Sequence, residues 1–164
     1  MSDCCQPQGE GELPRGRCPV CEVPGHPVPR VTLESLLLPE LRSEIGDAPH
    51  RFCPTPSCDV VYFDPERRSI FRRGDLTAKV HQKEPDDPDV PVCYCFGHTP
   101  RSMAEEVERT GESTTVREIR RRIQEEGCTC ERTNPQGRCC LGNVAMVVRN
   151  LRRAQGAPAR GENR

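Results

Sequence analysis

At 164 residues, the chain has the length of one ordinary domain or of two very small ones. Hydrophobic residues make up 34% of it, with no Trp, two Tyr and four Phe, which is thin material for a conventional core. The 24 Lys and Arg residues nearly balance 25 Asp and Glu residues, and the formal charge of -1 argues against a nucleic-acid-binding protein.

Twelve cysteines are the obvious source of the missing stability. No positively charged start followed by an apolar stretch precedes the first of them, and no apolar run is long enough to span a bilayer. We therefore expect a cytoplasmic protein, in which disulfides do not persist. The close C-x-x-C and C-x-C pairs would also close loops too short for a disulfide to stabilise the fold much. Metal binding is the role that this pattern predicts.

Composition divides the chain into five parts. Both ends are rich in Gly, Pro, Gln and charged residues without periodicity, which predicts disorder. A Pro-rich acidic segment between the early and late cysteines predicts a semi-extended linker, which would make the two halves separate folding units. The predicted parts are a tail over residues 1–16, a first metal-binding subdomain over 17–82, the linker over 83–91, a second metal-binding subdomain over 92–153 and a tail over 154–164.

The residue pattern of the first half predicts short strands. The β-prone runs 60–63 and 69–72 flank a five-residue segment with Pro and charged residues, and together they predict a hairpin with a longer loop. Residues 77–81 predict a third strand. Residues 32–38 predict a short helix with Thr32 as its N-cap.

The residue pattern of the second half predicts three short helices. Thr followed by Pro gives a cap and a favoured first residue for a helix over 100–109. A second helix is predicted from Thr115, where Thr115-x-x-Glu118 is a capping-box pattern, to Gly127. A third is predicted to begin around Cys140, because apolar residues then recur at helical spacing. Helices and strands in separate halves indicate an α+β fold class.

Four early cysteines form the first candidate site. The C-P-V-C sequence is a knuckle whose tight turn lets two thiolates reach one ion, and a later pair separated by four residues can complete a tetrahedral zinc site. The predicted zinc ligands are Cys18, Cys21, Cys53 and Cys58. We expect this zinc to be structural, since His26 and His50 give only weak grounds for an open catalytic position and are expected on surface loops.

The late cysteines have a different spacing. Cys93-Tyr-Cys95 places two thiolates closer together than a zinc knuckle usually does, as suits one iron of an iron–sulfur cluster. A cysteine at a helix start is well placed for a negative cluster, which favours Cys140 over its neighbour Cys139. Cys130 is the remaining candidate, and the nearby Cys128 stays an alternative to it. Cys4 and Cys5 are adjacent residues outside both sites, and we expect their thiols to be unligated. The alternative is that this pair binds a soft ion such as Cu(I).

Four cysteine-containing motifs follow one another along the chain. They are C-P-V-C from Cys18, C-D-V-V-Y-F from Cys58, V-C-Y-C-F from Val92 and N-P-Q-G-R-C-C from Asn134. Together they resemble the N-terminal domain of CopZ-type copper chaperones, over about residues 18–151. The resemblance implies a metal-stapled β-hairpin zinc subdomain, followed by a short-helical [2Fe-2S] subdomain similar to bacterioferritin-associated ferredoxin.

Carried over residue by residue, the resemblance gives both ligand sets. It implies zinc at Cys18, Cys21, Cys53 and Cys58, and a [2Fe-2S] cluster at Cys93, Cys95, Cys130 and Cys140. It also implies electron transfer that reduces Cu(II) to Cu(I) in copper homeostasis. The chain ends at Arg164 without the copper-binding module that such chaperones append. We therefore expect a separate copper-binding module or a copper-transporting ATPase as partner, and the electron donor is not indicated.

Two other functions compete with this interpretation. A structural or interaction module would hold two zinc ions and dock through basic residues of the second predicted helix, although interleaved glutamates favour a solvated surface. Those basic residues are Arg117, Arg120, Arg121 and Arg122. An enzyme is not expected, since no nucleophile and base pair, phosphate loop or nucleotide fingerprint is visible.

Overall fold

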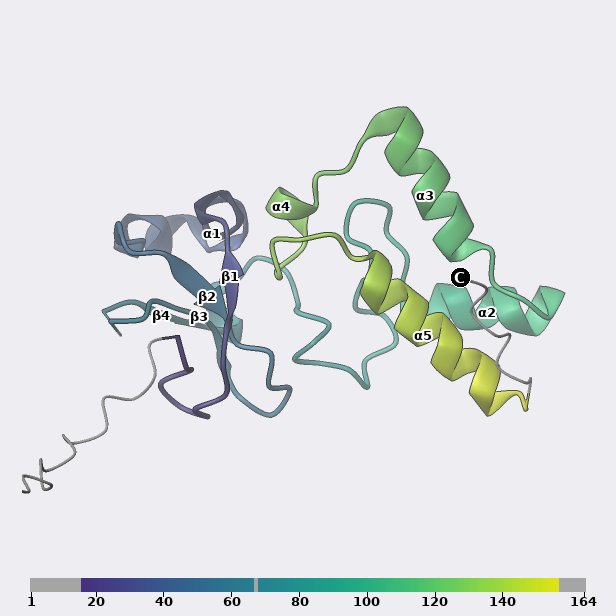
Figure 1. The fold of residues 1–164 in the computed structure, drawn as a ribbon, viewed down its shortest axis with the longest axis horizontal. Helices are drawn as coiled ribbons and strands as arrows, with labels where there is room; N and C mark the ends of the chain where they lie inside the picture. The colour runs from purple at the N-terminus through teal and green to yellow at the C-terminus, as the bar shows by residue number, and fades with distance from the viewer. Residues whose placement is uncertain (1–15, 67, 157–164) are drawn as a thin grey trace, which may run out of the picture.

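A computed structural model describes residues 16–66 and 68–156, which form a sheet-containing half and a helical half (Figure 1). Most of the two predicted tails, including Cys4 and Cys5, therefore lies outside the described residues. The expected α+β class is confirmed, because a four-stranded sheet precedes a run of helices. No helix in the described ranges is long and apolar enough to cross a membrane.

The first half is an antiparallel sheet with strand order β1-β2-β3-β4. Its strands are β1 His26–Val28, β2 His50–Phe52, β3 Val60–Phe63 and β4 Ile70–Arg72. The predicted hairpin is confirmed as β3 and β4, which are paired through Phe63 and Ile70 with a register shift between Val60 and Tyr62. Sequence analysis did not predict β1 and β2, which are only three residues long.

The predicted third strand over residues 77–81 is wrong. This segment forms bends and turns, because Thr77 is drawn to the helix of the first half instead of to a sheet edge. Its backbone amide donates to the carbonyl oxygen of Leu36 at 2.8 Å, and its hydroxyl donates to the same oxygen at 3.0 Å. Val80 is then buried in the core of this half.

The predicted helix of the first half is present but displaced. Helix α1 spans Arg30–Leu36, with Pro29 at its N-cap, and the 3-10 helix η1 Pro39–Glu44 follows it. Thr32 is therefore inside the helix and does not cap it. It is fully buried, and its hydroxyl donates to the carbonyl oxygen of Glu131 in the other half.

The helical half contains four helices within the described residues. They are α2 Pro100–Thr110, α3 Thr115–Glu126, α4 Cys130–Thr133 and α5 Leu141–Ala154. The three predicted helices are confirmed, and α4 is an addition. Thr99 caps α2 as expected, its hydroxyl accepting from the Ser102 amide at 3.1 Å, and Gly111 ends that helix with a φ of 78°.

The capping box predicted for α3 is wrong. Its N-cap is Thr114, whose side chain makes no capping bond. The carboxylate of Glu106 on α2 caps the helix from outside instead, accepting from the Thr114 amide at 3.0 Å and from the Thr115 hydroxyl at 3.0 Å. These bonds outweigh the effect of burial and lower the pKa of Glu106 to about 2.

Segment 83–91 is not a semi-extended linker. It runs through consecutive turns, such as the one in which the Asp87 amide donates to the Glu84 carbonyl at 3.1 Å. Val90 is buried within it, and Asp89 is paired with Arg101 of α2 at 2.5 Å. The segment is therefore packed against its surroundings.

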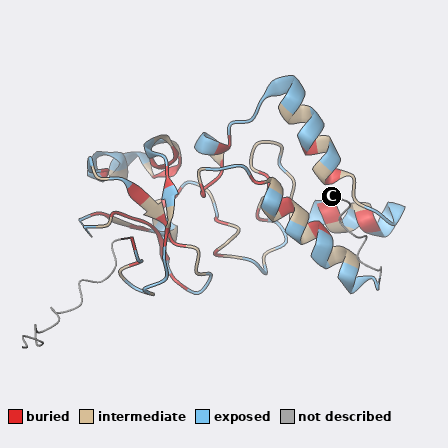
Figure 2. Cartoon of the chain, viewed as in Figure 1, coloured by how far each residue is buried: buried red, intermediate tan, exposed pale blue. Residues whose placement is uncertain are grey.

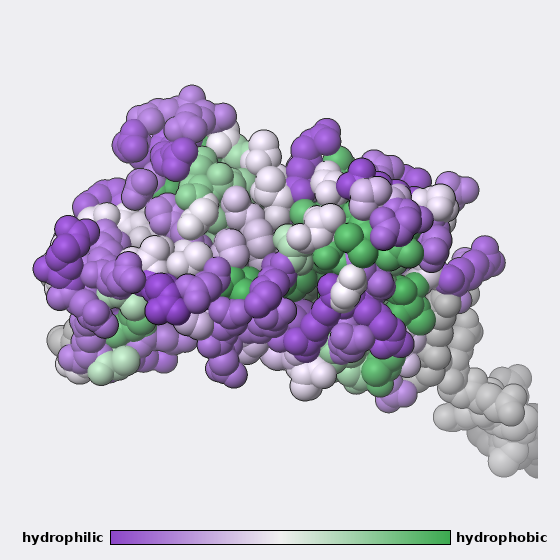
Figure 3. Space-filling model, turned by 180° about the vertical axis from the view of Figure 1, so that it is seen from behind, coloured by the Kyte–Doolittle hydropathy of each residue, from purple (hydrophilic) through white to green (hydrophobic). Residues whose placement is uncertain are grey.

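Buried residues follow the sheet and the inward faces of α2, α3 and α5 (Figure 2). The largest cluster of the first half includes Leu33, Phe52, Tyr62 and Phe71. The cluster of the second half includes Val92, Met103, Ile119 and Val144. Hydrophilic residues cover most of the rear face, with hydrophobic patches between them over both halves (Figure 3).

The two halves touch through α1 and α4, which lie side by side (Figure 1). Beside them, the buried hydroxyl of Tyr62 donates to the carbonyl oxygen of Pro135 at 2.8 Å. Gly137 packs so closely on α1 that a Cβ there would lie 2.6 Å from Pro29 Cδ. This contact positions the loop between α4 and α5 against the sheet-containing half.

Candidate metal centres

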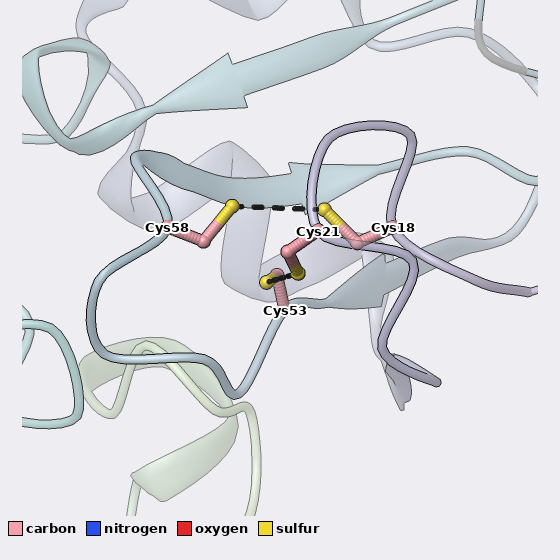
Figure 4. A group of neighbouring side chains, drawn as sticks. All are labelled: Cys18, Cys21, Cys53 and Cys58. Carbon is pink, nitrogen blue, oxygen red and sulfur yellow. Dashed lines mark hydrogen bonds between the residues drawn. The ribbon is translucent and has the colours of Figure 1, made fainter.

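Four cysteine side chains of the first half point toward one another (Figure 4). They are the four predicted zinc ligands Cys18, Cys21, Cys53 and Cys58, and all four Sγ atoms lie within 4.8 Å of one another. The Sγ atoms of Cys18 and Cys58 are 3.8 Å apart, and those of Cys21 and Cys53 are 3.6 Å apart. Zinc bonded to four thiolates at about 2.3 Å places its sulfurs about 3.8 Å apart, so this donor set fits tetrahedral zinc.

Backbone hydrogen bonds near these cysteines orient their thiols toward the shared site. The turn at Cys18 closes when its amide donates to the Val23 carbonyl at 2.9 Å, while the Glu22 amide donates to the Cys18 carbonyl at 3.0 Å. Cys53 directly follows β2, and its amide donates to the Val61 carbonyl of β3 at 2.9 Å. The site therefore ties the N-terminal knuckle to the centre of the sheet.

The thiols of this site differ in their environments. Burial works against ionisation of Cys21, but hydrogen bonds, led by that from the Thr55 hydroxyl 3.2 Å away, outweigh it and lower the pKa. Burial raises the pKa of Cys53, and the positive charge of Lys83 opposes that effect. Burial also raises the pKa of Cys58 to about 12. A cation is therefore needed to hold all four as thiolates at neutral pH.

His26 and His50, the two histidines considered beside the first site, are not part of its four-thiol group. His50 was expected on a surface loop but is buried in β2, where its Nε2 lies 2.8 Å from the Ser69 hydroxyl. That hydroxyl donates to the Asp64 carboxylate at 2.9 Å, and burial lowers the pKa of His50. His26 lies in β1, half-buried. The four thiols thus form a closed site.

A second group of cysteines lies in the core of the helical half. Cys93, Cys130 and Cys140 are buried there, and Cys95 is partly buried against them. The Sγ atoms of Cys95 and Cys130 are 3.5 Å apart. Hydrogen bonding among these thiols raises the pKa of Cys140 and lowers the pKa of Cys93 and of Cys130. The loop that carries Cys93 and Cys95, the start of α4 and the start of α5 therefore bring these four cysteines into one core.

The leftover cysteines of this half have a different position. Cys139 and Cys128 are both exposed, whereas their neighbours Cys140 and Cys130 are buried in the group. Cys140 is the N-cap residue of α5, at the helix start that the sequence indicated. Unlike the first group, the cysteines of this half do not include three whose Sγ atoms all lie within 4.8 Å of one another, as judged over the described residues.

The comparisons with known proteins fall on both halves. A family described as a zinc binding domain, zf_CopZ, matches residues 15–77. The X-ray structure of the Archaeoglobus fulgidus CopZ N-terminal domain superposes with a TM-score of 0.64 at 32% identity, covering 87% of this chain and 99% of that one. The chain belongs to the CopZ N-terminal domain family.

A second relative is longer than this chain. The copper chaperone CopZ of Archaeoglobus fulgidus is 39% identical over 125 residues, which are 76% of this chain. The present CopZ-type chain spans 57% of the length of that relative. Zinc binding by the four-cysteine site agrees with the family description and with the geometry.

Sequence analysis missed the residues around the first site. Thr55 and Lys83 contact its loop, although neither stands in a recognisable metal-binding pattern. The arginines considered as a docking face lie on α3, where Arg121 and Arg122 pair with Glu125 and Glu126. Such i,i+4 pairs are typical of a solvated helix surface.

Proposed function

We propose that the chain is a [2Fe-2S]- and zinc-binding protein of copper homeostasis whose cluster transfers electrons and reduces Cu(II) to Cu(I). The observation that carries this proposal is the second thiol group: four cysteines in the core of a half that the first site does not need. The proposed cluster ligands are Cys93, Cys95, Cys130 and Cys140, and the zinc ligands are the four cysteines of the first half.

The surroundings of the second group suit redox chemistry. A bound [2Fe-2S] cluster would accept one electron and supply it to one Cu(II) ion. The Thr133 hydroxyl lies 3.2 Å from Cys95 Sγ and can donate to it, which stabilises negative charge on the sulfur. Cys95 is also the least buried of the four proposed ligands, so electrons would enter and leave on its side.

One basic residue lies close to this side. The Arg122 guanidinium is 4.1 Å from the ring centroid of Phe96, which follows Cys95 in the chain. A positive charge near a cluster favours its reduced form, because reduction adds negative charge. The contact supports the proposal, and Glu126, which pairs with Arg122 at 3.2 Å, offsets part of that positive charge.

The same proposal covers partners and location. We propose a cytoplasmic, non-enzymatic carrier that meets a copper-transporting ATPase or a separate copper-binding module, with Cu(I) as the product handed on. The name of the A. fulgidus relative supports copper handling. Because the chain spans 57% of that relative, binding of Cu(I) by this chain itself is also a proposal.

Metal content tests this function. Protein purified without oxygen should be red-brown and contain about two irons and one zinc per chain. Dithionite should bleach it and produce an electron paramagnetic resonance signal, which added Cu(II) should remove as Cu(I) forms. A colourless protein with two zinc ions and no iron would contradict the proposal and favour the interaction module.

A further inference from the structure

A buried lysine lies beside the zinc site, and no described residue supplies a counter-ion to it. Lys83 is 3% exposed, and no carboxylate of the described residues lies within salt-bridge distance of it. Its Nζ donates to the Thr55 carbonyl at 2.8 Å and lies 5.7 Å from the ring centroid of Phe52. An ammonium group this deeply buried is costly unless negative charge lies nearby.

A second cation contacts the same loop. The Arg73 guanidinium donates to the carbonyl oxygens of Pro56 and Cys58, the latter at 3.5 Å. It also donates to the carbonyl of Lys83 at 2.8 Å, which joins the two basic residues. The loop between Cys53 and Cys58 is therefore held by two positive side chains.

Charge balance explains this arrangement. Zinc bound by four thiolates carries a net charge of about -2. The positive charge of Lys83 acts on one of these thiols, Cys53, and favours its ionised form. Arg73 is only 3.9 Å from the Asp59 carboxylate, whereas Lys83 has no such partner in the described part of the chain. The Lys83 ammonium is therefore the main positive charge that offsets the negative charge of the site, and Arg73, whose charge Asp59 partly balances, adds to it.

We propose that Lys83 and Arg73 form a cationic shell that protects the zinc from exchange with Cu(I). Exchange begins when a cation attaches to a zinc-bound sulfur, and neighbouring positive charge disfavours that step. The Zn–S bonds then break as Cu–S bonds form, Zn2+ leaves and no electron is transferred. Since Cu(I) is thiophilic, a protein that handles copper needs such protection for its structural zinc.

The need for this protection rests on the proposed copper function, whereas the zinc-release test depends only on the zinc site and not on electron transfer. The test uses the full chain with Cu(I) supplied as its acetonitrile complex, and a colorimetric zinc indicator follows zinc release. Lys83→Met should release zinc about tenfold faster than the unchanged protein, since residues that support metal ligands have effects of this size. Lys79→Met is the matched control, because Lys79 is exposed and paired with Asp87 at 2.9 Å.

Two further variants separate charge from packing. Lys83→Arg keeps the positive charge and should release zinc at nearly the original rate, whereas Lys83→Gln keeps a hydrogen-bond donor and should resemble Lys83→Met. If Lys83→Met does not fold, the zinc-release rates of Lys83→Arg and Lys83→Gln test the proposal. Equal rates for Arg and Gln at position 83, or a Lys83→Met rate matching that of Lys79→Met, would overturn the proposal.

Discussion

The two halves place their cysteines differently relative to the hydrophobic core. In the sheet-containing half, Cys18 and Cys58 belong to a small cluster with Val60 and Phe63, apart from the larger cluster under α1. In the helical half, Cys93 and Cys140 belong to the main core itself. The comparison teaches that the cysteines of the first half tie loops to the edge of a core, whereas those of the second half are part of the core itself.

The largest effect is expected from a lost zinc ligand. Cys58→Ala should abolish zinc binding and unfold the sheet-containing half, because structural zinc supplies more than the roughly 5 kcal/mol available to a marginal domain. The helical half should keep part of its cluster absorbance, since it has its own core. Zinc analysis and visible spectroscopy measure the two outcomes, with the exposed Ser57→Ala as control. Complete loss of both metals would show that the halves form one cooperative unit.

The next largest effect distinguishes adjacent cysteines. Cys140→Ser should remove or shift the visible spectrum of the cluster, because Cys140 is buried among the other proposed ligands at the start of α5. Cys139→Ser should be nearly silent, since Cys139 is exposed. Absorbance and iron content check both variants. Bleaching by Cys139→Ser alone would move the ligand by one residue.

A smaller effect is expected where the halves meet. Gly137→Ala should destabilise the protein by about 1–3 kcal/mol, because Gly137 has a φ of 64° and a Cβ would lie 2.6 Å from Pro29 Cδ. Gly142→Ala on α5 is the control, since a Cβ there meets nothing within 4 Å. Denaturant unfolding measures both. If the two variants are equally stable, this contact does not hold the halves together.

The smallest effect belongs to the helical half alone. Glu106→Gln should cost about 1 kcal/mol near neutral pH, because the carboxylate caps α3. The folded pKa of about 2 lies below the ordinary glutamate pKa of 4.5. The stabilisation is therefore present above about pH 4.5 and is lost as the pH falls toward 2. Melting temperatures across this range should converge for the two proteins at low pH; a constant difference would contradict the prediction.

Local chemistry let the sequence determine much of this protein. The cap at Thr99, the stop at Gly111 and the strand pair β3 and β4 depend on residues close together in the chain, so their patterns were readable. The C-P-V-C knuckle was readable for the same reason. The choice of Cys140 over Cys139 was also indicated by a local feature, the start of α5, and burial agrees with it.

Tertiary structure decided what depends on distant partners. Thr32 looked like a helix cap, yet its hydroxyl bonds Glu131, 99 residues away in the chain. Glu106 caps α3 in place of Glu118 because packing of α2 brings its carboxylate to the helix start. Lys83, in a segment that sequence analysis took for a linker, is buried beside the zinc site. Sequence patterns carry local preferences, whereas these contacts form only when separate elements pack and exclude water.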